Sequence, residues 1–241
     1  MRIKPHEGSI PSLGTKKSMS IPLRWSSELA YVVGIITTDG SLSIDGRHVT
    51  ITSTDEQLLK TCLMCLQKTT RISLSPKGSL SKKTAYRVQI GDVHFYHWLL
   101  NIGLFPRKSL TIKSLCIPNK YFCDFLRGHL DGDGSIIHYT DRYLIKSNPS
   151  YVYDRVFVYF LSASGIHIQW IRRKIKELKN LHGSLSPSKS KTQKGTAIVY
   201  RLKYSTKETK LLLNWMYYRS GLPCLHRKYQ IAKPYITLSS E

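Results

Sequence analysis

The sequence predicts an α+β protein made of two pseudo-symmetric αββαββα repeats, each forming a four-stranded antiparallel sheet. Three observations predict this fold class. Short segments recur in the same order in both halves of the chain, apolar residues recur at helical spacing in some stretches, and they alternate with polar residues in others. With 41% hydrophobic residues among 241, the chain has enough apolar side chains to bury a core.

The internal repeat is clearest in a nine-residue segment. VGIITTDGS at 33–41 recurs as RGHLDGDGS at 127–135. Further matches follow in the same order: SLSP at 73–76 and 184–187, YRV at 86–88 and YRL at 200–202, and Gly-Leu followed by an Arg-Lys pair at 103–108 and 221–228. Chance matches would not stay collinear, so we infer two homologous halves in one chain.

The predicted organisation follows from these matches. It comprises an N-terminal arm at 1–24, a first half at 25–112, a linker at 113–119, a second half at 120–236 and a tail at 237–241. The arm carries Pro, Gly and Lys without periodicity.

Each half is predicted to contain seven elements in the same order. In the first half these are a helix at 27–38, strands at 41–45 and 48–53, a helix at 55–67, strands at 71–75 and 85–90, and a helix at 93–102. In the second half they are a helix at 120–132, strands at 135–139 and 156–162, a helix at 166–181, strands at 183–187 and 197–204, and a helix at 206–219.

Spacing and alternation justify these elements in turn. In 48–53, Val49 and Ile51 alternate with polar residues, as strands with one buried face do. The helix at 55–67 carries Leu59, Leu63 and Leu66 on one face. In the strand at 85–90, Val88 and Ile90 alternate with Arg87 and Gln89. In the helix at 166–181, Ile171, Ile175 and Leu178 recur at helical spacing. In the strand at 197–204, Leu202 and Tyr204 alternate with Arg201 and Lys203. Each sheet is therefore expected to be apolar toward its helices and basic or polar on its other face.

Charge and cysteine content narrow the class of protein. The chain has 37 Lys and Arg against 15 Asp and Glu, a net charge of +22, which points to a polyanionic partner. No apolar run is long enough to span a membrane, and the first residues lack the apolar stretch of a secretory signal. Five cysteines, an odd number, argue against a disulfide framework and favour an intracellular, reducing compartment. Cys62 and Cys65 lie on a leucine stripe and are expected to be core thiols.

Asp39 and Asp133 occupy equivalent places in the two repeats. Each directly precedes a glycine, Gly40 or Gly134, that is expected to cap a helix. Both carboxylates are then predicted at the negative end of a helix dipole, where an anion is disfavoured by about 0.3–1 kcal/mol. Free carbonyls gather at the same end, and hard divalent cations prefer carboxylate and carbonyl oxygens. The duplicated aspartate therefore indicates a bound cation.

Small residues in the same helices predict how the aspartates meet. Gly34 and Thr38 are four residues apart, as are Gly128 and Gly132, and this spacing lets helices pack with their backbones close. Packed so, the two helices would bring both aspartates side by side. Each carboxylate would then raise the pKa of the other, and bound Mg²⁺ would keep both ionised for phosphodiester hydrolysis.

These segments carry a family resemblance. Residues 32–40 and 126–134 resemble the two signature helices of single-chain LAGLIDADG homing endonucleases. The flanking sequences WSSELAY at 25–31, PRKS at 106–109 and Ile-Pro at 117–118 agree. The resemblance implies a DNA-binding saddle that clasps duplex DNA in the major groove. It also implies Mg²⁺-dependent cutting of both strands across the minor groove that leaves 3′ overhangs. Two or three Mg²⁺ ions are implied, at sites that also accept Mn²⁺ or Ca²⁺.

The resemblance also implies residue roles. Asp39 and Asp133 would be metal ligands, joined by the backbone oxygens of Thr38 and Gly132. A family lysine near the attacking water matches Lys203, and its counterpart in the first half is Gln89. Both are expected catalytic residues.

The chain also departs from the family pattern. Thr37 replaces the first acidic residue of the first motif, whereas Asp131 keeps it in the second. Arg127 and His129 stand where apolar residues are usual, and we expect both to face outward without a role.

The DNA-binding residues are predicted from their places on strands and hairpins. Lysines at hairpin tips are expected to contact phosphates, and Arg and Gln on strands to read base edges. Lysines predicted at tips are Lys77, Lys82, Lys83, Lys189, Lys191 and Lys194. Predicted base readers are Arg47, Arg87, Gln89, Arg142 and Arg201. Further contacts are predicted for Ser41, Ser43, His48, Thr50, Thr52, Ser135, Tyr139 and Lys203.

The Asp-Gly segments also have alternative interpretations. An EF-hand loop around Asp133 would need His129 and Thr140 as its first and twelfth ligands, so that interpretation fails. A second alternative is that each Asp-Gly pair merely terminates a helix and has no other role. His94 and His97 are expected on the surface rather than at a metal site.

The functional prediction is a monomeric, intron-encoded or free-standing endonuclease with a long, loosely palindromic target. Two alternatives stay open: a non-catalytic DNA-binding regulator with the same saddle, and an RNA maturase that assists splicing of its host intron RNA.

Overall fold

The computed structural model describes residues 21–75, 84–143, 150, 152–192 and 195–237. Elements of the first half are α1 (Ser27–Asp39), β1 (Gly40–Leu42), β2 (His48–Ser53), α2 (Glu56–Cys65), β3 (Ser73–Leu74), β4 (Tyr86–Gly91), α3 (Val93–Asn101) and η1 (Lys108–Leu110). Elements of the second half are η2 (Asn119–Tyr121), α4 (Phe122–Asp131), β5 (Ser135–Asp141), β6 (Tyr153–Ser162), α5 (Gly165–Lys179), β7 (Ser184–Thr192), β8 (Gly195–Tyr204), α6 (Thr206–Met216), α7 (His226–Ala232) and η3 (Lys233–Tyr235).

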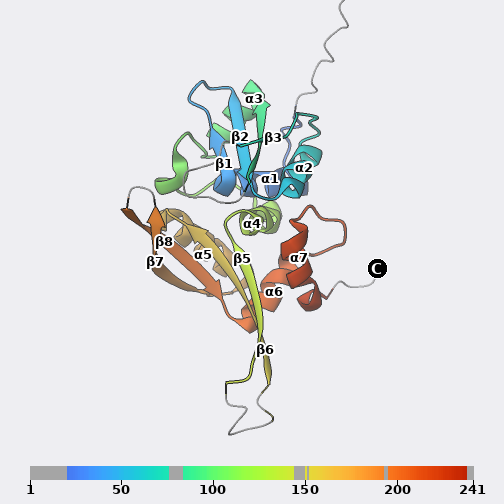
Figure 1. The fold of residues 1–241 in the computed structure, drawn as a ribbon, viewed down its shortest axis with the longest axis vertical. Coiled ribbons are helices and arrows are strands. Elements are labelled where there is room, and N and C mark those ends of the chain that lie inside the picture. Colours follow the sequence, from blue (N-terminus) through green and yellow to red (C-terminus); the bar gives the residue numbers. More distant parts are fainter. Residues whose placement is uncertain (1–20, 76–83, 144–149, 151, 193–194, 238–241) are drawn as a thin grey trace, which may run out of the picture.

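Two four-stranded sheets form the frame of the molecule. Their strand orders are β1-β2-β4-β3 and β5-β6-β8-β7, and all pairs are antiparallel. The same order in both halves confirms the predicted α+β fold of two pseudo-symmetric repeats. In Figure 1, α1 and α4 lie in the middle of the molecule, with β1–β4 on one side and β5–β8 on the other.

Glycines allow α1 and α4 to pack with their backbones in contact. A Cβ atom on Gly34 would lie 2.6 Å from the His129 nitrogen, and one on Gly128 would lie 2.9 Å from the Tyr31 carbonyl carbon. Real Cβ atoms do not approach other atoms so closely, so only glycine fits at these two positions. The small-residue spacing therefore works as the sequence predicts, and it joins the two halves along the central helices.

The two Asp-Gly turns differ from the predicted C-caps. Gly40 caps α1, but in extended rather than left-handed conformation. In the second half Gly132 caps α4, so Asp133 lies beyond the helix and not in its last turn. Steric closeness explains why both repeats have glycine at this place: a Cβ atom on Gly40 or Gly134 would lie within 3 Å of the backbone of its own preceding helix. Both glycines let the chain fold sharply from helix into strand.

The sheets bury one face each, as alternation predicts. Val49, Ile51 and Val88 of the first sheet are fully buried, and so are Val156 and Val158 of the second. The outward positions of β1, β2 and β4 carry polar residues or glycine. The outward face of the second sheet differs from the prediction, because apolar and aromatic residues lie among its basic ones: Ile137, Phe157, Tyr159, Leu161 and Val199.

Three short elements, η1, α7 and η3, were not predicted. The turn η1 and the helix α7 lie at equivalent places near the ends of the two repeats, and α7 buries only Lys228 and Ala232. Such a short, mostly polar segment has no apolar stripe, and this explains why spacing does not reveal it. Within the described ranges, no helix is long and apolar enough to cross a membrane.

Candidate functional site

The two predicted acidic residues meet where the central helices end. Asp39 is the last residue of α1, and Asp133 follows the end of α4 by two residues. Gly132 packs against the first helix end: a Cβ atom there would lie 3.1 Å from Oδ2 of Asp39 and 2.8 Å from Cβ of Thr38. The structure therefore brings together Asp39, Thr38, Gly132 and Asp133 from both halves.

The surroundings of Asp39 and Asp133 disfavour the ionised form of both carboxyl groups. Burial, together with the nearby charge of Asp133, raises the pKa of Asp39 to about 7. Burial also raises the pKa of Asp133 above its usual value. Lys228 and Lys108 act in the opposite direction on the pKa of both aspartates. The site is thus acidic and only partly balanced by lysine, with Asp39 half-buried and Asp133 exposed to solvent.

Lys228 binds the carbonyl groups at the end of α4. From helix α7 its Nζ donates hydrogen bonds to the oxygens of Leu130 (2.7 Å), Asp131 (2.8 Å), Gly132 (3.1 Å) and Gly134 (2.6 Å). These four acceptors exceed the three protons of one ammonium group, so the hydrogen bonds are shared. The lysine therefore collects the free carbonyls that gather at a helix C-terminus.

Lys108 holds the equivalent place in the first half. The turn η1 presents its buried side chain, and Nζ donates a hydrogen bond to the Gly40 oxygen, at the end of α1. Burial lowers the pKa of Lys108 and of Lys228 to about 8, whereas Asp39 and Asp133 raise it. Sequence reasoning missed both lysines. The signal that could have found them is the duplicated Arg-Lys pair at 107–108 and 227–228.

Replacing Lys228 with Met is expected to lower the free energy of unfolding by about 3 kcal/mol or more. Methionine leaves several buried carbonyls without a donor, and each unsatisfied group costs about 1–3 kcal/mol. Urea denaturation at pH 7.5 measures the loss. Lys233→Met provides the control, because Lys233 is exposed and its replacement should change stability by no more than about 0.5 kcal/mol. Equal stability of both variants would contradict the role given to Lys228.

The lysine predicted from the family pattern lies on the second sheet. Lys203 is on β8, where it pairs with Tyr159 and Ser184, and its Nζ lies 4.0 Å from the centre of the Phe157 ring. Its counterpart Gln89 is exposed on β4 opposite Thr50. Among the described lysines, the charges of Lys108 and Lys228 lower the pKa of both Asp39 and Asp133.

Predicted DNA-binding residues of the first half form rows across its sheet. Ser41, Thr50 and Gln89 are register partners, as are Thr52 and Arg87. At the β1–β2 turn, Arg47 is exposed, and the His48 ring nitrogen Nδ1 lies 2.5 Å from Asp45. The backbone oxygen of Ser43 accepts a hydrogen bond from Tyr96. The hairpin lysines Lys77, Lys82 and Lys83 lie outside the described residues.

Predicted residues of the second half lie on β5, β7 and β8 or just after β5. Ser135 is the first residue of β5, and its register partner Tyr159 also pairs with Lys203. Tyr139, Arg142, Lys189 and Arg201 are exposed. Lys191 is part of β7, opposite Thr196, whereas Lys194 lies outside the described residues.

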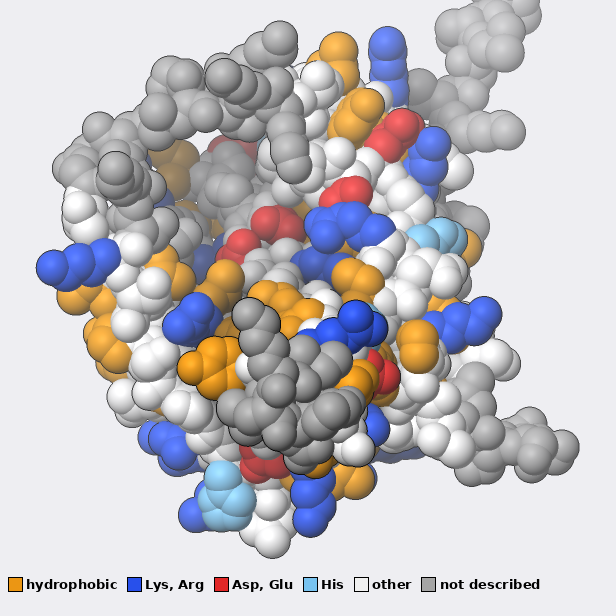
Figure 2. Space-filling view, turned by 60° about the horizontal axis from the view of Figure 1, so that its bottom comes forward, with side chains coloured by type: hydrophobic (Ala, Val, Ile, Leu, Met, Phe, Trp, Pro, Cys, Tyr) orange, Lys and Arg blue, Asp and Glu red, His pale blue; other side chains and the backbone are white. Residues whose placement is uncertain are grey.

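Basic and acidic side chains are arranged unevenly on the surface. On the face in Figure 2, acidic side chains lie near the middle, beside a hollow, with Lys and Arg side chains around them. An anionic polymer held by the surrounding cations would therefore lie over the acidic groups, which repel it unless a divalent cation intervenes.

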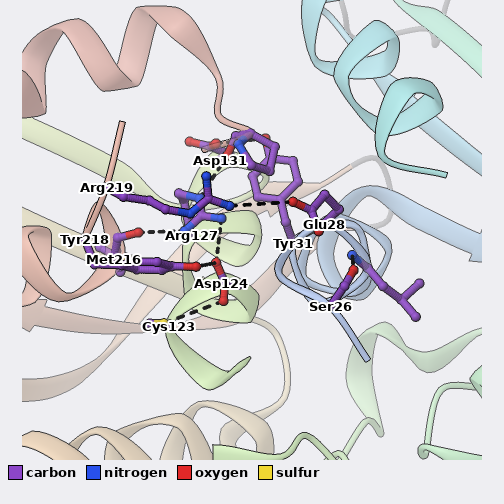
Figure 3. A network of polar contacts seen from close by, with 12 residues as sticks. Ser26, Glu28, Tyr31, Cys123, Asp124, Arg127, Asp131, Met216, Tyr218 and Arg219 are labelled. Carbon is purple, nitrogen blue, oxygen red and sulfur yellow. Dashed lines mark hydrogen bonds and ion pairs between the residues drawn. The ribbon is translucent and has the colours of Figure 1, made fainter. Parts of the chain in front are cut away.

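Arg127 was expected to face outward, and this is wrong. Its side chain is fully buried (Figure 3) and donates hydrogen bonds to Asp124 (2.8 Å), Met216 O (2.6 Å) and Pro223 O (2.9 Å). Its guanidinium also lies 5.5 Å from the centre of the Tyr31 ring. A buried charge is tolerated when it is paired and hydrogen-bonded, and these partners satisfy that condition. Arg127 therefore ties α4 to the segment after α6.

The hydrogen bonds of Thr37 and of its counterpart Asp131 explain why the two motifs differ at this position. Thr37 donates its hydroxyl hydrogen bond to the Val33 oxygen of its own helix. Asp131, its counterpart, is buried and accepts hydrogen bonds from Tyr31 OH (2.9 Å) and Leu225 N (2.7 Å). These contacts are structural, and neither residue is part of the acidic pair.

His129 is likewise buried, contrary to prediction. Its ring lies 5.6 Å from that of His167, nearly parallel to it, and His167 Nδ1 lies 2.7 Å from the Lys113 oxygen. Burial lowers the pKa of His129 well below its usual value, and it lowers that of His167 to about 4. Both imidazoles are therefore neutral at physiological pH.

Acidification is expected to destabilise the protein through His167. Its folded-state pKa lies below the unfolded value near 6.5, so the stabilisation is complete above pH 6.5 and is lost as pH falls toward 4. The shift corresponds to about 3 kcal/mol. In urea denaturation at pH 7.5 and 4.5, His167→Gln should lose less stability on acidification than wild type. The exposed-residue control His94→Gln should follow wild type; if all three proteins respond alike, the assignment to His167 is wrong.

The donor set suits a hard divalent cation. Two carboxylates whose ionisation is unfavourable gain from a cation that neutralises both, and carboxylate oxygens are preferred ligands of Mg²⁺. The Gly132 oxygen, expected as a further ligand, accepts a hydrogen bond from Lys228 at 3.1 Å. In the described part of the chain, no group of three or more acidic, His or Cys side chains is suited to a metal. Asp39 and Asp133 are therefore the side chains that would hold the ion.

Comparison with known proteins identifies the fold. No protein-family model and no curated protein matches the chain. Among solved structures, I-DmoI in complex with DNA and Ca is 15% identical, with a TM-score of 0.52 over 86% of this chain and 97% of that one. The I-LtrWI LAGLIDADG homing endonuclease bound to target DNA is 12% identical, with a TM-score of 0.52 over 86% and 89%.

A third structure is full-length DUF199/WhiA from Thermatoga maritima. It is 14% identical, with a TM-score of 0.51 over 89% of this chain. The match spans 63% of that protein. At these identities the likeness concerns the fold, and the fold is that of LAGLIDADG proteins.

Proposed function

We propose that this chain is a site-specific double-strand DNA endonuclease of the homing type. It hydrolyses phosphodiester bonds across the minor groove with Mg²⁺ and leaves 3′ overhangs. The observation that carries the proposal is the acidic pair. Asp39 ends α1 and Asp133 follows α4 by two residues, close enough for its charge to raise the pKa of Asp39, and the two flanking sheets carry exposed basic residues. The fold shared with I-DmoI in complex with DNA and Ca, and with I-LtrWI bound to target DNA, supports it.

The aspartates and the lysines of the site have different proposed roles. Asp39 and Asp133 would hold the divalent cations. A cation there supplies neutralisation of charge on the phosphate oxygens and lowers the pKa of the attacking water. Lys108 and Lys228 fix the helix ends that present the aspartates and offset part of their charge. In the reaction, the water oxygen bonds to phosphorus as the bond to the leaving sugar oxygen breaks.

The surface around the acidic pair would bind the duplex. A net charge of +22 favours phosphate contacts, which set affinity, while side chains on the outward sheet faces read base edges. Because the two halves differ in sequence, the target should be long and only loosely palindromic. One chain carries both halves, so the enzyme is proposed to act as a monomer. A reducing compartment fits its five free thiols.

Cleavage of a randomised DNA library tests the proposal. Purified protein is incubated with the library in Mg²⁺, and newly formed ends are captured and sequenced. We expect one family of long, imperfectly palindromic targets cut with 3′ overhangs in Mg²⁺, and no cutting in EDTA. A protein that binds duplex DNA yet cuts no sequence in Mg²⁺ or Mn²⁺ would refute the nuclease.

A second candidate function is DNA binding without cutting. The observation that favours it is the Lys228 ammonium, which occupies the Gly132 oxygen and three neighbouring carbonyls at the acidic helix end. A lysine can supply the positive charge that this end requires. In the library experiment this function predicts selective retention of duplex targets with and without Mg²⁺, and no new ends.

A further inference from the structure

The two outward sheet faces have different chemistry. In the first half, the outward positions of β1, β2 and β4 are polar residues or glycine, such as Ser41, Thr50 and Gln89. In the second half, Ile137 is 45% exposed, and Tyr159 and Leu161 are half-buried on the same face. Exposed apolar groups that adjoin polar ones commonly mark a binding surface.

A hollow lies among these apolar side chains. It has a volume of about 340 Å³ and is lined by Ile137, Tyr159, Leu161, Val199, Arg201 and Lys189, among others. Ser135, the residue at its end nearest the acidic pair, follows Asp133 by two positions on the way into β5. The hollow therefore begins two residues along the chain from Asp133 of the proposed cutting site.

Cations lie beside Tyr159, one of the residues that line the hollow. The Arg201 guanidinium lies 5.6 Å from the centre of the Tyr159 ring, and Lys203 Nζ lies 5.7 Å from the same ring. Such cation–π contacts hold the two cations against the sheet. On the face in Figure 2, hydrophobic side chains lie among Lys and Arg. The surface thus pairs an apolar floor with charges that suit a polyanion.

Duplex DNA offers one apolar group to such a surface. In the major groove every base edge presents hydrogen-bonding atoms, and thymine alone adds a 5-methyl group that projects into the groove. The flat faces of paired bases are stacked inside the duplex and cannot reach side chains on a sheet. An apolar hollow between basic residues therefore matches thymine methyl groups flanked by phosphates or guanines.

We propose that the second half recognises its DNA half-site through thymine 5-methyl groups, seated in the hollow formed by Ile137, Tyr159, Leu161 and Val199. The first half, with polar outward residues, reads its half-site through hydrogen bonds. The inference rests on the proposed binding of duplex DNA. It adds a chemical class of target: a site whose two halves differ in their dependence on thymine methyl groups.

Deoxyuridine substitution tests the inference directly, because it removes the methyl group and keeps base pairing. The target selected from the library is prepared with thymine replaced by deoxyuridine in one half, in the other half, or in both. Fluorescence anisotropy in Ca²⁺ measures the Kd of each duplex. We expect one half to weaken binding by about fourfold for each contacted methyl group lost, and the other half by less than about twofold.

Rescue and variants tie the effect to the hollow. Bromodeoxyuridine, whose bromine is close to a methyl group in size, should restore the affinity. Ile137→Thr keeps the β-branched shape but makes the hollow polar, so it should abolish the difference between thymine and deoxyuridine in the sensitive half. Ile166→Thr is the matched control: Ile166 is 57% exposed on α5, a helix of the same half, and its replacement should leave the difference unchanged.

The following outcomes would contradict the inference. Tight duplex binding with equal deoxyuridine effects in both halves, or a selected half-site without thymine, would overturn it and leave the nuclease standing. Binding of no duplex would refute both. Tighter binding to single-stranded than to duplex oligonucleotides, weakened by Phe157→Leu, would show that the aromatic face stacks unpaired bases instead.

Discussion

Replacing Asp39 or Asp133 with Asn is expected to abolish double-strand cleavage while leaving duplex binding intact. Each carboxylate is proposed to hold a divalent cation, and the uncharged amide is a much weaker ligand. Loss of about 4 kcal/mol of transition-state stabilisation corresponds to a thousandfold lower rate. Conversion of supercoiled plasmid carrying the selected target to nicked and linear forms measures the effect on each strand.

Stability separates this effect from simple unfolding. Because the folded-state pKa of Asp39 is raised to about 7, its ionisation destabilises the fold as pH rises from about 4 through 7. Asp39→Asn removes that cost, so without divalent ions at pH 8 the variant should be at least as stable as wild type. Glu177→Gln, which removes one exposed carboxylate from α5, should cut normally. Normal cutting by both aspartate variants would reject the site.

Replacing Gly128 with Ala is expected to cost at least about 3 kcal/mol of folding stability. The new methyl group would lie 2.9 Å from the Tyr31 carbonyl carbon and closer still to its oxygen, so α1 and α4 would have to move apart. Overpacking in a core typically costs about 1–3 kcal/mol, and a backbone neighbour that cannot rotate away places this case at the upper end. Gly34→Ala faces the Phe125 oxygen and should behave alike.

Gly91→Ala provides the matched control for this prediction. A Cβ atom on Gly91 would lie 3.4 Å from the His48 ring, an ordinary contact, and the residue is exposed on β4. Its replacement should change stability by less than about 1 kcal/mol. Urea denaturation of the three variants measures the ranking. Similar stabilities of Gly128→Ala and Gly91→Ala would mean that the central helices do not pack as described.

Periodic patterns explain how much of the fold could be predicted. Alternation in 48–53 and 85–90 identifies the buried residues Val49, Ile51 and Val88, because a strand with one covered face repeats every two residues. The small residues at 34 and 128 predict the packing of the central helices, which in turn brings Asp39 and Asp133 together. These features depend on local spacing or on a duplicated motif, and both are visible in one sequence.

The missed features depend on partners far along the chain. Arg127 is buried because it donates to backbone oxygens 89 and 96 residues away, at Met216 and Pro223. Lys228 is buried because α7 folds back to the end of α4. A lysine or arginine is ordinarily assigned to the surface. Only the tertiary arrangement shows that helix-end carbonyls, rather than water, solvate these charges.

The sequence-based prediction of positive charge at the two Asp-Gly turns was also incomplete. It inferred from the duplicated Asp-Gly turns that positive charge must balance each helix end, and it assigned that charge to a metal ion alone. The structure places lysines there as well, from η1 and α7. The repeat of the Arg-Lys pair contained this information, but charge pairs on short polar segments do not indicate their partners.

The glycine contact between α1 and α4 limits how such proteins can be recombined. Each helix leaves a backbone-sized gap for the other, with Gly34 on one side and Gly128 on the other. In a chimeric protein that exchanges one repeat for a foreign one, the foreign repeat must therefore supply a glycine in register with the glycine of the retained repeat. Modular swapping of half-site specificity depends first on this match, and only then on the residues that face DNA.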